Sequence, residues 1–127
     1  MTNGVKSFED LRVFQEARGL TERIWKVTRN RPFYSDKVMI AQLRRAGLSI
    51  VSNIAEGFER GSRAEFGRFL RIAKGSCGEV RTQVLVAADL NYISKRECAE
   101  LCDSARHVGA GLAKLVNYLK VSLPAST

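Results

Sequence analysis

Residues 62–89 read SRAEFGRFLRIAKGSCGEVRTQVLVAAD, a pattern that is typical of a long amphipathic helix. Its apolar side chains recur at alternating steps of four and three residues, the seam that antiparallel helices packed at about 20° require. Ser62 and Glu65 match a capping box, in which each side chain accepts a hydrogen bond from a free backbone N–H of the other residue. The seam positions are Phe66, Leu70, Ala73, Cys77, Val80, Val84 and Ala87.

Three other segments show the same kind of apolar periodicity. Ser94 and Glu97 form a second capping box before residues 95–120, while Ser7 and Ser35–Asp36 indicate two further helix starts. Pro32 and Gly61 indicate where the first and second helices end. The sequence therefore predicts one all-α domain over residues 1–127, an antiparallel up-and-down four-helix bundle joined by short turns. The expected helices are 8–30, 36–60, 63–91 and 95–120, with a frayed tail at 121–127.

Composition is consistent with a small globular protein inside the cell. The chain has 127 residues, of which 45% are hydrophobic and 27% charged, enough to form a core without a metal or a disulfide. Neither a secretion signal nor an apolar run long enough to cross a bilayer is visible, so no membrane contact is expected. The three cysteines are then expected to be reduced thiols, and the predicted location is the cytoplasm.

The chain is strongly basic, and its basic residues are concentrated in one segment. The net charge is +8, and 14 of the 21 basic residues are arginine, which binds phosphate through two parallel hydrogen bonds. Residues 60–74 contain five basic side chains and the single acid Glu65. This excess favours contact with RNA or DNA, although an incidental basic surface is the alternative. The basic residues are Arg60, Arg63, Arg68, Arg71 and Lys74.

A polar stripe follows the expected second helix at steps of three and four residues. It consists of Gln42, Arg45, Ser49, Asn53, Glu56 and Arg60. One interpretation is a solvated outer face. The other is a buried polar network with Arg45, Asn53 and Glu79 as members, because Ser and Asn are poor residues for a helix interior unless their side chains have partners.

Residues with catalytic or metal-binding chemistry are sparse. His107 is the only histidine, and it lies on a different face from Cys98 and Cys102, so a zinc site lacks ligands. Glu56 and Glu79 could form a carboxylate pair, but no nucleophile or base accompanies them. The small residues at 75–78 do not follow a strand and are expected to let two helices approach closely. We therefore expect no catalytic residue, no metal, no cofactor and no enzymatic activity.

Several apolar residues lie away from the main seams. A bundle of this size has one core, so a second apolar face indicates self-association. The alternative is that aromatic residues near helix ends cover the ends of the bundle. The residues concerned are Val13, Trp25, Phe33, Tyr34, Phe69, Ile72 and Val86.

Short motifs across 8–119 resemble the four-helix bundle proteins encoded in intervening sequences of bacterial 23S ribosomal RNA genes. The resemblance implies a ring-like homopentamer with a positively charged surface. It also implies a relationship to the accessory protein of diversity-generating retroelements, which acts beside a reverse transcriptase and binds nucleic acid. The matching basic residues would be Arg44, Arg45, Arg60, Arg63 and Arg71. The motifs are FEDL at 8–11, QLRRA at 42–46, SI at 49–50, NIAEG at 53–57, EF at 65–66, FL at 69–70, Ala73 and GS at 75–76.

Two functions follow as hypotheses. The first is a non-enzymatic oligomer that binds the backbone of RNA or DNA, with little sequence preference, beside a nucleic-acid enzyme. The second is a scaffold that docks a protein through Trp25, Phe33 and Tyr34, with incidental charge. The residues expected to contact nucleic acid are Arg44, Arg45, Arg60, Arg63, Arg68, Arg71 and Lys74.

Overall fold

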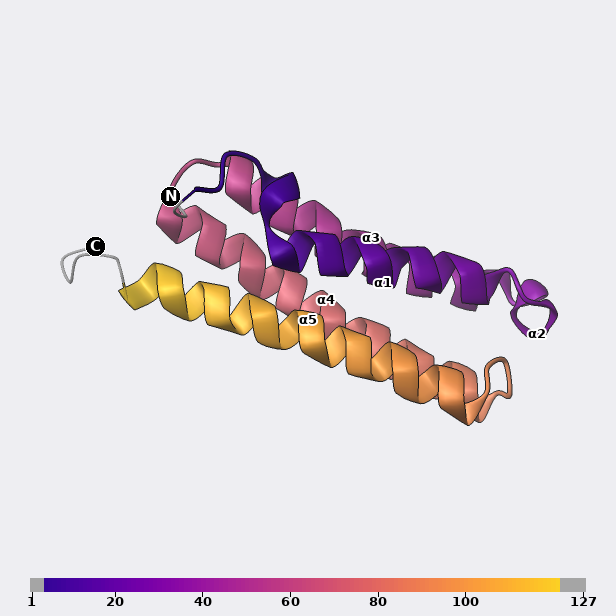
Figure 1. Ribbon diagram of the computed structural model, residues 1–127. Helices are drawn as coiled ribbons and strands as arrows, with labels where there is room; N and C mark the ends of the chain where they lie inside the picture. Colours follow the sequence, from indigo (N-terminus) through magenta and orange to yellow (C-terminus); the bar gives the residue numbers. More distant parts are fainter. Residues whose placement is uncertain (1–3, 122–127) are drawn as a thin grey trace.

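A computed structural model describes residues 4–121. Within this part of the chain, four long helices run alternately up and down and pack side by side (Figure 1). The predicted all-α four-helix bundle is confirmed. In chain order the elements are the 3₁₀ helix η1 (Phe8–Asp10) and the α-helices α1 (Arg12–Thr28), α2 (Arg31–Tyr34), α3 (Lys37–Glu59), α4 (Arg63–Asp89) and α5 (Lys95–Val121).

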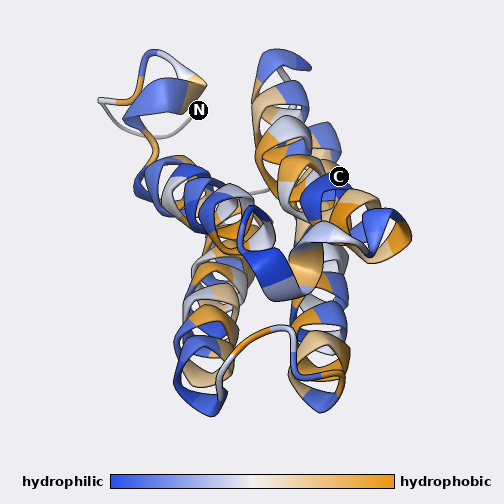
Figure 2. Cartoon of the chain, turned by 90° about the vertical axis from the view of Figure 1, so that its right-hand side faces the viewer, coloured by the Kyte–Doolittle hydropathy of each residue, from blue (hydrophilic) through white to orange (hydrophobic). Residues whose placement is uncertain are grey.

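The core lies along the common axis of the four long helices. Helix α3 packs on α4, α4 on α5, and α1 on both α3 and α5, so the chain closes a ring of four neighbours. Figure 2 shows the hydrophobic residues on the sides of the helices that face one another. The seam predicted for α4 is fully inside, since Phe66, Leu70, Val80 and Val84 have no exposed surface. Its periodicity therefore determines which side of α4 is buried.

Three of the long helices begin with a side-chain N-cap at the residue that the sequence predicts. Ser94 and Glu97 form the complete capping box, with N–H···O distances of 2.9 and 3.0 Å. Asp36 caps α3 by accepting a hydrogen bond from Met39 N at 3.0 Å. Ser62 Oγ accepts from Glu65 N at 3.1 Å, but the Glu65 carboxylate binds arginines instead of returning to the Ser62 backbone.

The prediction of one continuous helix over residues 8–30 is wrong. Leu11 is extended and buried, and it separates η1 from α1. The turn lets Phe8 pack edge-on against Phe14, with ring centroids 5.0 Å apart. At the other end α1 stops at Thr28, and Pro32 sits in the first turn of the short helix α2, where its missing N–H costs no hydrogen bond.

The turns between the later helices depend on left-handed residues. Gly61 has φ +84° directly after α3, and Asn91 has φ 63° between α4 and α5. Helix α4 consequently ends at Asp89, two residues before the predicted end. Helix α5 continues through Val121, which was expected in the tail, and the rest of that tail, 122–127, lies outside the described residues.

Three of the residues expected to form a second apolar face are buried in this chain. Val13 and Phe69 are 7% exposed and Phe33 is 0% exposed, so none of them is available to a partner. Phe33 covers one end of the bundle and lies 5.2 Å from the Tyr92 ring, as the alternative interpretation predicts. Trp25 is half-buried, while Tyr34, Ile72 and Val86 are exposed.

Candidate nucleic-acid interface

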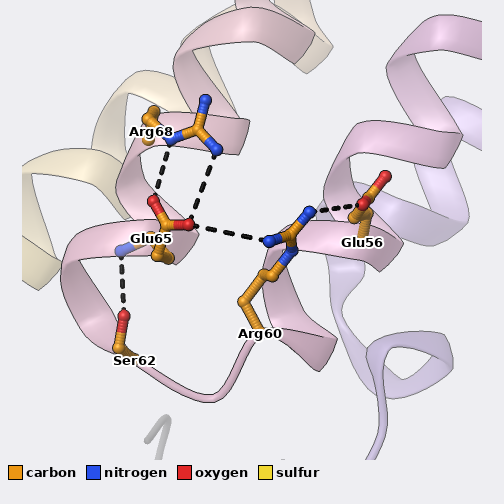
Figure 3. A network of polar contacts seen from close by, with 5 residues as sticks. All are labelled: Glu56, Arg60, Ser62, Glu65 and Arg68. Carbon is orange, nitrogen blue, oxygen red and sulfur yellow. Dashed lines mark hydrogen bonds and ion pairs between the residues drawn. The ribbon is translucent and has the colours of Figure 1, made fainter.

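Two arginines of the predicted basic segment, Arg60 and Arg68, form ion pairs with the carboxylate of Glu65. Arg68 Nε donates to Glu65 at 2.8 Å, and Arg60 lies 3.9 Å from the same carboxylate while pairing with Glu56 at 2.8 Å (Figure 3). The hydrogen bond from Arg68 holds the pKa of the Glu65 carboxyl below its usual value. Glu56 and Glu65 therefore offset the positive charge of two of the predicted cations, Arg60 and Arg68.

The same two arginines also contact an aromatic ring. The guanidinium groups of Arg60 and Arg68 lie 4.9 and 4.5 Å from the centroid of the Phe69 ring. Cation–π contact of this kind stabilises a guanidinium in place. Together with the two carboxylates, the ring engages part of each guanidinium group, so this cluster stabilises the turn between α3 and α4.

Two other predicted arginines connect helices within the bundle. Arg44 Nε donates to Thr28 Oγ1 at 2.9 Å, and its guanidinium lies 4.8 Å from the Trp25 ring, so it joins α3 to α1. Arg63 is half-buried, with its guanidinium 5.4 Å from the Tyr118 ring of α5. Both side chains have structural contacts that a nucleic acid would have to replace.

Arg71 and Lys74 lie in a different environment. They line a groove of about 460 Å³ between α4 and α5, which we call the basic groove. Both side chains are exposed, and across residues 4–121 neither has a carboxylate within ion-pair distance. Two unneutralised cations thus share one concave surface. The groove is lined by Arg71, Lys74, Gly75, Ala113, Val116 and Asn117.

Arg81 extends this positive surface and was not singled out in the sequence. Burial raises the pKa of the Cys77 thiol to about 11, an effect that the positive charges of Arg81 and Lys74 partly offset. Lys74 and Arg81 stand one helical turn before and one turn after Cys77, whose Cβ lies 3.8 Å from the position of a Cβ at Gly109 of α5, so both cations lie on the flank of α4 that is near α5. The signal was present, because Arg81 follows Lys74 by seven residues, or two helical turns. Asn117 of α5 gave no sequence signal, since its place beside Arg71 depends on packing.

The remaining predicted cation is separate from the groove. Arg45 is exposed on α3. It is not among the residues that line the basic groove. The seven predicted residues therefore do not form one site. The structure brings Arg71 and Lys74 together, commits Arg44, Arg60, Arg63 and Arg68 to intramolecular contacts, and leaves Arg45 apart.

A polar network does cross between α3 and α4, but with fewer of the predicted members. Ser76 Oγ donates to Ser49 Oγ at 2.8 Å, and Asn53 Nδ2 donates to the same oxygen at 3.1 Å. Ser76 was not predicted, although it is 3% exposed. The other predicted members are exposed and take no part, because their side chains point outward from the α3–α4 seam. These are Gln42, Arg45, Glu56 and Glu79.

The titratable side chains outside these clusters do not gather into a further site in the described part of the chain. Among the described residues no three His, Cys, Asp or Glu side chains lie close enough together to hold a metal ion. His107 Nε2 is 2.7 Å from Glu16, which joins α5 to α1. No helix within residues 4–121 combines the length and apolar content needed to cross a lipid bilayer.

The fold places the chain among small all-α four-helix bundles. Residues 9–114 match the family described as 23S rRNA-intervening sequence protein, and the chain belongs to this family. Its fold is similar to the crystal structure of a protein of unknown function from the S23 ribosomal protein family of Bacteroides thetaiotaomicron. That similarity has a TM-score of 0.72 and 24% identity, and covers 82% of this chain and 97% of the other. No curated protein matches the sequence.

Proposed function

We propose that the protein binds the sugar–phosphate backbone of RNA or DNA in the basic groove, without catalysing a reaction. The observation that carries this proposal is the pair Arg71 and Lys74, which share a groove and have no carboxylate partner in the described chain. Phosphate oxygens are the ligands that such cations attract, and counterions released from the nucleic acid drive the association. The net charge of +8 adds long-range attraction.

The groove supplies charge, and little that distinguishes one base from another. Apart from the two cations, its polar side chain is the amide of Asn117. Backbone contacts position a nucleic acid but carry no sequence information. The proposed binding is therefore salt-sensitive and weakly sequence-specific. Arg60 and Arg68 are expected to contribute little, because Glu56 and Glu65 already neutralise them.

Charge reversal at the groove tests this proposal. The variant Arg71→Glu/Lys74→Glu is compared with Lys95→Glu/Arg96→Glu, which changes the net charge equally at the start of α5. Arg96 is 88% exposed, and acids suit a helix N-terminus, so the control should fold. The groove variant should lose at least about tenfold in affinity for labelled RNA relative to the control. Equal losses in the two variants would show that only overall charge matters and would refute the groove.

We also propose that copies of the chain associate, with the pentamer that the family resemblance implies as the expected state. Exposed apolar side chains on α3 and α4 support association, since such surface is unfavourable in water. Along the middle of these two helices they include Leu48 at 46%, Ile72 at 43%, Leu85 at 53% and Val86 at 41%. Sedimentation velocity should give a mass of several subunits that falls on Ile72→Glu or Val86→Glu; a single-subunit mass for the unaltered chain would contradict association.

A protein-docking role has one supporting observation. Tyr34 and Val38, at the junction of α2 and α3, are 71% and 74% exposed. The other residues first considered for docking do not support it, because Phe33 is buried and Trp25 is covered in part by Arg44. Pull-down after nuclease treatment separates the two functions, since protein partners persist and partners held through RNA do not. Retention of a nucleic-acid enzyme after nuclease would indicate the accessory role.

A further inference from the structure

We propose that the basic groove takes a single strand of nucleic acid, with its backbone lying along the α4–α5 seam, in preference to a duplex. This inference rests on the proposed function and adds the class of ligand. It depends on how the cations are arranged along α4 and on what forms the floor between them.

The cations form one line. Arg71, Lys74 and Arg81 lie within eleven residues of α4, and the ten steps from Arg71 to Arg81 correspond to about 15 Å of helix. Lys74 and Arg81 are two turns apart on the same flank, and both lie close enough to Cys77 to act on its thiol. A single strand has one phosphate per nucleotide and can follow such a line. Successive phosphates along the strand can then each contact a different cation.

A duplex fits this line poorly. Its two backbones wind around the axis and are separated by grooves about 6 and 12 Å wide in B-form DNA. A straight row of cations therefore meets each duplex backbone only once. To hold a duplex, the protein would need a second row of cations, separated from the first by the width of a DNA groove. The residues that line the groove supply no such second row, because its cations, Arg71 and Lys74, both lie on α4.

The floor of the groove admits close approach. A Cβ at Gly75 or Gly78 would meet no heavy atom within 4 Å in the described chain, so neither glycine is needed for packing inside the bundle. In a helix interior glycine is less favourable than alanine, so packing and helix propensity do not explain these two residues. Gly75 lines the groove together with Ala113, and these two small residues leave space for a ribose and its phosphate to lie against the helix.

A second copy of the same face is a poor occupant. The seam presents Arg71, Lys74 and Arg81, and an isologous contact would place these cations against their own copies. Like charges brought together in this way are repulsive. A polyanion is the complementary ligand for this surface.

The test compares an unstructured 12-nucleotide single-stranded DNA with a 12-base-pair DNA duplex by fluorescence anisotropy. The single strand should bind at least about tenfold more tightly. Gly75→Leu, which fills the floor without removing charge, should weaken single-strand binding at least about fivefold. The control is Gly19→Leu on α1, where an added Cβ also meets nothing within 4 Å; it should leave binding unchanged. Thermal melting of both variants verifies that each is folded.

The outcomes separate this inference from the proposed function. Equal or tighter binding of the duplex would overturn the single-strand preference, as would unchanged binding by Gly75→Leu. If Arg71→Glu/Lys74→Glu still abolished binding in that case, the groove would remain the nucleic-acid site. No binding of either ligand by the unaltered protein at low salt would overturn both proposals.

Discussion

Ser76 on α4 donates a hydrogen bond of 2.8 Å to Ser49 Oγ on α3, across the half-buried middle of the seam between these helices. Asn53 donates to the same oxygen, so one serine hydroxyl accepts hydrogen bonds from two helices. A polar contact at this depth requires both helices to keep one axial register. The pair therefore fixes how α3 and α4 align.

Loss of this contact should destabilise the protein measurably. Ser76→Ala removes the donor to Ser49 and should lower the free energy of unfolding by about 1 kcal/mol. The measurement is urea denaturation followed by circular dichroism. Ser52→Ala, on the exposed side of α3, is the matched control and should change stability by less than about 0.5 kcal/mol. Equal stability of the two variants would mean that the Ser49–Ser76 contact contributes nothing.

Two glycine-to-alanine substitutions should have opposite effects. A Cβ at Gly57 would lie 2.6 Å from Phe69 Cβ, which forces α3 and α4 apart, so Gly57→Ala should cost about 1–3 kcal/mol. A Cβ at Gly75 meets nothing within 4 Å, so Gly75→Ala should stabilise α4 by about 0.5–1 kcal/mol. Thermal melting of both variants measures the difference. Destabilisation by Gly75→Ala would contradict the open floor of the groove.

Acid should weaken the start of α3. The Met39 N–H and then the Tyr92 hydroxyl, 2.8 Å away, hold the pKa of the Asp36 carboxyl below its usual value. A lowered pKa in the folded state contributes stability above the unfolded value, and this contribution is lost as the pH falls through the folded pKa. The melting temperature of Asp36→Asn should therefore depend less on pH below about 4 than that of the unaltered protein. Parallel curves for the two proteins would refute this role.

The cysteines should differ in reactivity. Burial raises the pKa of Cys77 to about 11 and also raises that of Cys102, whereas Cys98 is only half-buried. Because the thiolate is the reactive form, Cys98 should be alkylated first by iodoacetamide in the folded protein. Mass spectrometry of digested samples identifies the modified residue. Early modification of Cys77 would mean that α4 and α5 separate readily at its level.

Much of the fold could be predicted because apolar spacing determines which side of each helix is buried. Phe66 and Leu70 show this, since their four-residue step is local in the sequence and both are fully buried. The break at Leu11 could not be predicted in this way, because it depends on Phe8 reaching Phe14 after the chain turns. Local periodicity contains no information about that contact.

The candidate site was only partly visible in the sequence, for a related reason. The run of basic residues from Arg60 to Lys74 is evident, but their partners come from other elements: Glu56 for Arg60 and Trp25 for Arg44. Only packing shows that Arg71 and Lys74 keep their charge and that Asn117 of α5 lies beside them.

The dependence of binding on salt tests the central claim most directly. Affinity for a single-stranded RNA is measured from low to moderate salt for the unaltered protein and for Arg71→Gln/Lys74→Gln. If both side chains contact phosphates, the slope of log affinity against log salt should become shallower by about 1.4, since each single-strand phosphate contact contributes about 0.7. The same slope and affinity in both proteins would contradict nucleic-acid binding in the basic groove.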